Sequence, residues 1–165
     1  MDKFEIIKFG PYRFIGKTAY LRSGAPSAVW EALFKDGEDW VLPKLDEMNE
    51  YATDETHTVA LYNWDRYDQK ESLLGYCVGR FMKPDTPVPD NFDFYDIPEI
   101  LVGKSFLSGE SEYTNGLCNY GRENAERLGH KLSKSPLFSA EVFTKPNPNG
   151  GNFDWFYEAF EPNES

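Results

Sequence analysis

The chain has 165 residues, of which 40% are hydrophobic and 16% aromatic, and its formal net charge is −11. This composition is too apolar for a disordered chain and predicts a single globular domain with a sizeable core. The negative charge argues against a duplex nucleic-acid surface, because phosphate binding needs a basic face; it suits solubility in a cytosol, and it also attracts cations.

The first half of the chain is predicted to contain a strand, a helix and two further strands. A strand-like string, Phe-Ile-Gly-Lys-Thr, occupies residues 14–18 and is followed by a polar break. Pro26 suits the first position of a helix, and a helical stripe resumes over residues 43–52. Two strand-like runs follow, at residues 57–63 and 71–82.

The second half repeats this order. An apolar-apolar-Gly-Lys-hydroxyl string recurs at residues 101–105, and apolar positions stepping by three or four predict a helix over residues 117–132. Strand-like runs follow at residues 137–144 and 153–160. The order strand, helix, strand, strand therefore occurs twice, which indicates an internal duplication with a ligand cleft at the seam between the copies.

The two halves are joined by a connector at residues 84–98, in which prolines alternate with aspartates. Such a segment is extended and is neither a helix nor a central strand. Its aromatic residues are too apolar for a free linker, so we expect it to pack on the body. The predicted organisation is one domain over residues 1–165, with repeat one at about 4–83 and repeat two at about 99–161.

Several classes of protein have little support in the sequence. No segment approaches the roughly 18 uninterrupted apolar residues of a membrane span, and the first residues are not a basic leader, so we expect a cytoplasmic protein. Cys77 and Cys118 have no CxxC spacing, and we expect no metal or cofactor. His57 and His130 are isolated, and no nucleophile or phosphate-binding motif is present, so an enzyme is not the favoured class.

Glu141 is the only ionisable group in the apolar run 137–143. Strand alternation places Glu141 and Phe143 on one face. If the following hairpin pairs in an even register, Glu141 lies across from Trp155 and beside Tyr157, which would set a carboxylate in a box of aromatic rings.

Two other arrangements of Glu141 stay open. An odd register would place it beside Asp154 and Glu158, and on a strand covered on one face only it would point to solvent.

Rings from the first half can complete the box, since Tyr62 and Trp64 end the strand that matches that of Glu141, and Tyr76 lies on its partner. Ring faces attract a cation by about 0.5–2 kcal/mol each, and a carboxylate adds a charge-assisted contact. The combination predicts binding of a lipophilic cation. Ordinary core packing is an equally good interpretation of each ring.

The chain resembles the GyrI-like small-molecule-binding domain in residues 4–7 and 12–17, in the duplicated order of elements and in the strand at 138–143. This family, of SOUL-like fold, also forms the effector-binding half of AraC- and MerR-type multidrug-responsive regulators. The resemblance implies an α+β fold of two βαββ repeats with pseudo-two-fold symmetry. It further implies an antiparallel sheet with two helices and a central ligand cleft that contains Glu141. The family more typically has tyrosine at the position of Phe143.

We therefore expect a stand-alone domain that senses or sequesters lipophilic aromatic or cationic compounds, without direct contact to nucleic acid. Two alternatives remain. One is a small hydrolase of reactive electrophilic compounds that uses Glu141 as its acid. The other is an acidic protein-interaction module that engages a topoisomerase. The sequence identifies neither the ligand nor a protein partner.

Overall fold

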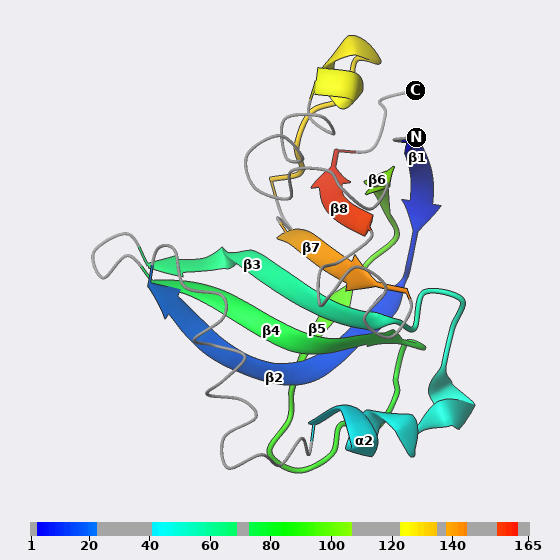
Figure 1. The fold of residues 1–165 in the computed structure, drawn as a ribbon, viewed down its shortest axis with the longest axis vertical. Coiled ribbons are helices and arrows are strands. Elements are labelled where there is room, and N and C mark those ends of the chain that lie inside the picture. The colour runs from blue at the N-terminus through cyan, green and yellow to red at the C-terminus, as the bar shows by residue number, and fades with distance from the viewer. Residues whose placement is uncertain are drawn as a thin grey trace.

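The computed structural model describes residues 3–22, 41–68, 73–106, 123–134, 138–144 and 155–161. Over these residues the chain forms one antiparallel sheet of eight strands, ordered β1-β6-β8-β7-β3-β4-β2-β5 and curled into a half-barrel (Figure 1). The strands are β1 (Lys3–Phe9), β2 (Tyr12–Arg22), β3 (Thr58–Asp68), β4 (Leu73–Met82), β5 (Asp93–Ile97), β6 (Ile100–Phe106), β7 (Phe138–Phe143) and β8 (Trp155–Phe160).

The two faces of this sheet carry different clusters of buried residues. The concave face carries the main core, to which all eight strands contribute a buried residue: Phe9, Phe14, Val59, Cys77, Ile97, Ile100, Phe138 and Tyr157. The outer face carries Ile15 and Met82, which pack against Val41 and Leu45 of helix α2 (Val41–Asp46). Side chains alternate between the faces along each strand, so the face of any strand residue follows from its position.

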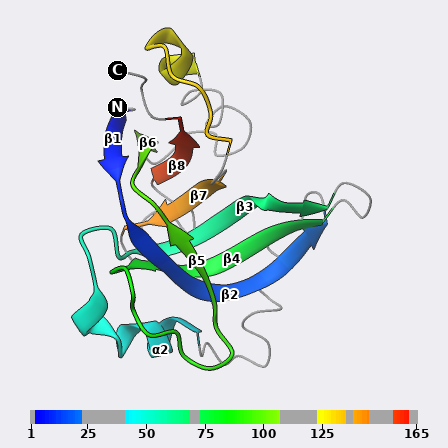
Figure 2. The ribbon, with the colours of Figure 1, turned by 180° about the vertical axis from the view of Figure 1, so that it is seen from behind.

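The described helices are short. Helix α2 is followed by the 3-10 helix η2 (Asn49–Tyr51), and residues 123–127 are helical. In both views α2 and the 123–127 helix lie at opposite ends of the sheet (Figures 1 and 2). The second helix ends earlier than predicted, because Gly129 adopts a φ of 84° and Leu132 bridges to Phe160 of β8. The helix predicted to begin at Pro26 lies outside the described residues.

The strand order confirms two βαββ repeats related by a pseudo-two-fold axis. Repeat one contributes β3-β4-β2, repeat two contributes β7-β8-β6, and the central pair β3–β7 joins them. Two strands were not predicted: β1 pairs with β6 of the second repeat, and β5 pairs with β2 of the first. The repeats are thus joined by the central pair, by β1 at one edge of the sheet and by the connector strand β5 at the other.

The two Gly-Lys strings lie on the equivalent strands β2 and β6, but their side chains face opposite ways. Phe14 and Val102 both lie in the concave core, so Gly16 is on the concave face and Gly103 is on the outer face. The string therefore identified the right strands, while its residue-by-residue alignment is wrong. Gly16 has a local reason of its own, because a Cβ there would stand 2.2 Å from the Val78 carbonyl oxygen.

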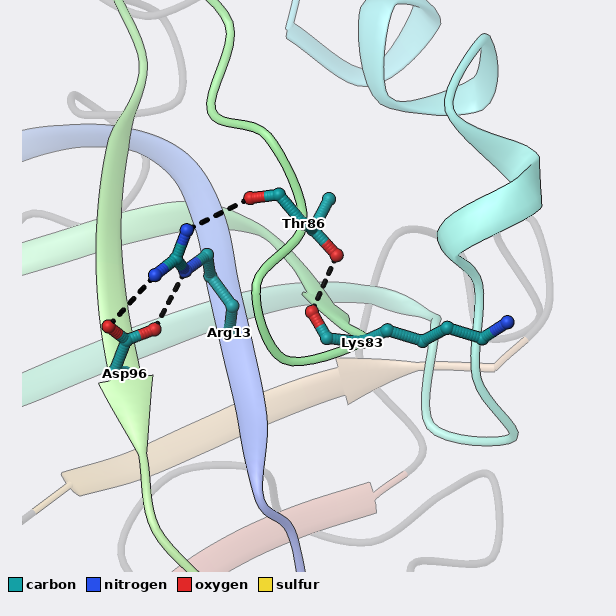
Figure 3. Close-up of polar contacts among 4 residues, drawn as sticks. All are labelled: Arg13, Lys83, Thr86 and Asp96. Carbon is teal, nitrogen blue, oxygen red and sulfur yellow. Dashed lines mark hydrogen bonds and ion pairs between the residues drawn. The ribbon is translucent and has the colours of Figure 1, made fainter.

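The connector packs on the body, as predicted. Arg13 of β2 donates from Nε and Nη2 to the Asp96 carboxylate at 2.7 and 3.1 Å, and from Nη1 to the Thr86 carbonyl oxygen at 3.0 Å (Figure 3). Phe92 packs on the cluster around α2, and Tyr95 packs on the concave core. Within the connector β5 is an edge strand, which agrees with the exclusion of a central strand.

Candidate ligand-binding site

The pairing of β7 with β8 decides which side chains surround Glu141. Glu141 pairs with Phe156, and Val142 pairs with Trp155. This is the odd register, so the even register and the aromatic box built on it are wrong. Because directly opposed residues share a face, Trp155 and Tyr157 lie on the concave face, where both pack with the main core, while Glu141 lies on the outer face.

Glu141 stands at the centre of the sheet, opposite Ala60 of β3. The Tyr62 hydroxyl donates to Oε1 of Glu141 at 2.9 Å, and the Tyr76 hydroxyl donates to the same oxygen at 3.4 Å. The two tyrosine rings meet edge to face, with centroids 5.0 Å apart. The structure thus brings together three of the predicted site residues, and they come from both repeats.

Two further residues, Phe143 and Trp64, were predicted for this site. Phe143 shares the face of Glu141 two residues further along β7 and is half-buried. Trp64 belongs to β3 at a point where the register with β4 shifts, between Asn63 and Tyr67, and its side chain lies outside the described residues.

Three residues that the prediction left out of the site lie on the same face: Ser139, Phe156 and Glu158. Glu158 is opposite Ser139, diagonal to Glu141, and only 3% exposed. A second carboxylate therefore lies close to the first, as the odd-register alternative predicted. The signal that could have found it was the register, which strand alternation alone does not specify.

Burial dominates the electrostatics of Glu141. Desolvation raises the pKa of its carboxyl group above the ordinary value, and the hydrogen bonds from Tyr62 and Tyr76 oppose this in part. Among the described residues no lysine, arginine or histidine forms an ion pair with Glu141. The described residues also contain no cluster of three or more His, Cys, Asp or Glu side chains able to hold a metal ion. No described helix is long and apolar enough to cross a membrane.

Comparisons with known proteins show which solved structures share this fold. No family model matches the chain, and no curated protein matches its sequence. A candidate bacterial transcription regulation protein from Staphylococcus aureus MU50 superposes with a TM-score of 0.57 at 10% identity, over 99% of both chains. SAV2435 bound to tetraphenylphosphonium gives 0.55 at 6% identity, over 96% of this chain and 93% of its own. The EcmrR C-terminal domain gives 0.52 at 14% identity, over 100% of this chain and 98% of its own.

The chain has the GyrI-like fold. At these identities the likeness shows the fold alone. It agrees with the predicted α+β architecture of paired repeats, and on this GyrI-like fold the described site lies on the outer face, where β3 and β7 meet.

A first prediction concerns the stability of this site. A raised pKa means that the folded protein holds the Glu141 proton more tightly than the unfolded chain. The resulting stability is complete below the ordinary pKa of 4.5 and is lost as the pH rises through the folded value. Glutamine stays uncharged, so Glu141→Gln should raise Tm at neutral pH by about 2–4 °C, the shift that about 1 kcal/mol produces in a domain of this size.

The gain should disappear below about pH 4, where wild-type Glu141 is protonated in both states. Thermal unfolding followed by circular dichroism at both pH values measures it. A Tm gain of the same size at both values would contradict this account of Glu141.

Proposed function

We propose that this chain binds lipophilic cations on the outer face around Glu141. The observation that carries the proposal is Glu141 itself, a largely buried carboxylate that accepts two tyrosine hydroxyl bonds and has no cationic partner among the described residues. Hydroxyl donors leave the negative charge in place. A bound cation compensates that charge where water is excluded.

The surroundings of Glu141 suit an apolar ligand body. Tyr62 and Tyr76 present rings beside the carboxylate, and Phe143 and Phe156 share its face. Each ring that meets the cation face-on adds about 0.5–2 kcal/mol. The net charge of −11 favours the approach of cations over the whole surface.

Proteins of the same fold support this assignment. SAV2435 was solved bound to tetraphenylphosphonium, which is a lipophilic cation. One further neighbour is a candidate transcription regulation protein. We assign this chain the role of a small-molecule-binding domain of the regulator type, which senses or sequesters its ligand.

Titration calorimetry of wild type and Glu141→Gln with tetraphenylphosphonium tests the proposal. Glutamine keeps the shape of the side chain and removes its charge, so affinity should fall about 10- to 150-fold, the range of a charge-assisted contact worth about 1.5–3 kcal/mol. Triphenylphosphine oxide, which carries phenyl rings and no net charge, should bind both proteins with similar affinity.

Glu99→Gln is the matched control, because Glu99 is an exposed carboxylate in the turn between β5 and β6 and its loss changes the net charge equally. Glu158 does not serve as a control, since it lies on the same face as Glu141. Equal losses in Glu141→Gln and Glu99→Gln would assign the effect to the general acidic field. Absence of tetraphenylphosphonium binding by wild type would refute the proposal.

A further inference from the structure

A second polar cluster lies on the concave face, opposite to the Glu141 site. Glu55 belongs to the turn before β3, Lys104 to β6 and Tyr157 to β8. Lys104 Nζ donates to Glu55 Oε1, and the Tyr157 hydroxyl donates to Glu55 Oε2 at 2.8 Å. The side chains of Lys104 and Glu55 are only 11% and 12% exposed. Both oxygens of one carboxylate from repeat one are thus held by donors from repeat two.

Aromatic rings surround this cluster. Lys104 Nζ lies 4.8 Å from the centroid of the Tyr157 ring. Phe9 contacts Tyr157 and Tyr12, with centroid distances of 5.9 and 4.7 Å. Tyr12 thus belongs to this group of rings through its contact with Phe9, and burial, followed by the charge of Glu55, raises the pKa of Tyr12. The polar donors therefore stand in a largely apolar wall built from β1, β2 and β8.

The turn that carries Glu55 is anchored independently of the Glu55 carboxylate. Thr56 Oγ1 donates a hydrogen bond to the Phe81 carbonyl oxygen at 2.6 Å and accepts one from the Thr53 amide at 2.7 Å. In addition, Ala52 forms a β-bridge with Met82. The turn therefore has anchors that do not depend on the position of the Glu55 carboxylate.

We infer that Lys104 and Tyr157 form a binding site for an aromatic carboxylate, and that Glu55 occupies this site as an internal ligand. A buried ammonium group needs an anion, and two converging donors are the usual means of holding a carboxylate. The surrounding rings select an anion with an aromatic body. An external ligand of this class competes with Glu55, which makes the Glu55 side chain an autoinhibitory contact.

Glu55→Ala with benzoate as the probe tests the inference. Removing the internal carboxylate should lower Tm, because Lys104 is left buried without an anion. Benzoate should then restore Tm in a saturable way, with an affinity about tenfold or more above that for wild type. Benzyl alcohol, which has the ring without the charge, should have no such effect. The double variant Glu55→Ala/Lys104→Met should not respond to benzoate.

Glu55→Gln keeps the size of the side chain and is the variant to measure if Glu55→Ala does not fold. It should also bind benzoate more tightly than wild type does, and benzoate should recover folded Glu55→Ala during refolding. If neither variant responds to benzoate, or if the response survives Lys104→Met, the inference is overturned.

Discussion

Replacing Gly16 by alanine should remove more than about 4 kcal/mol from the free energy of unfolding, a large share of the roughly 5–15 kcal/mol by which native domains are stable. A Cβ at Gly16 would stand 2.2 Å from the Val78 carbonyl oxygen and 2.8 Å from Gly79 Cα. Both atoms belong to the backbone of β4, which pairs with β2 along its length. Neither can move without breaking the ladder. Urea unfolding followed by circular dichroism measures the loss.

Gly103→Ala provides the matched comparison, because Gly103 is the corresponding glycine of the second Gly-Lys string. Its Cβ would stand 2.5 Å from Cε2 of Phe160 and 3.1 Å from the ring of Phe4. These are side-chain ring atoms, which can shift without breaking the backbone ladder, so the expected cost is about 1–3 kcal/mol. Equal losses at Gly16 and Gly103 would contradict the account of two non-equivalent glycines.

Replacing Lys104 by methionine should reduce the free energy of unfolding by about 3–5 kcal/mol. The change leaves the Glu55 carboxylate buried with one neutral donor, the Tyr157 hydroxyl, as its remaining hydrogen-bond partner in the cluster. The double variant Lys104→Met/Glu55→Gln carries no unpaired charge and should recover most of the loss. Chemical unfolding of wild type, both single variants and the double variant gives the coupling energy.

Lys44→Met is the control for this cycle. Lys44 pairs with Glu47 on the surface, where the two side chains are 48% and 69% exposed. Exposed pairs contribute about 0–1 kcal/mol. If the losses in unfolding free energy of Lys104→Met and Glu55→Gln simply added up in the double variant, the coupling energy would be zero. The buried pair would then contribute no more than the exposed one.

Local patterns in the sequence were enough for the fold class and for the residue at the centre of the candidate site. The repeated order of elements predicted the two βαββ units, since each unit shows its strands and helix within a short stretch of chain. Glu141 was identified because a single charge interrupts an apolar strand, and Tyr62 and Tyr76 were assigned to the strands that face it. The structure joins these three by hydrogen bonds.

Strands β1 and β5 were missed for a physical reason. Strand β1 of the first repeat pairs with β6 of the second, and β5 of the connector pairs with β2 of the first, so no turn or hairpin signal marks either pairing. In addition β5 lies among prolines and aspartates, and its place at the sheet edge is compatible with that composition.

The sequence by itself determined the paired repeats, the packed connector and the unusual carboxylate, because each is written in residues close together along the chain. The tertiary structure decided which side chains accompany that carboxylate. A shift of one residue in the β7–β8 pairing leaves the alternating pattern unchanged and moves Trp155 and Tyr157 to the opposite face. It also decided that Glu55 meets Lys104, because a buried ion pair between different repeats is formed by packing and has no counterpart in local sequence.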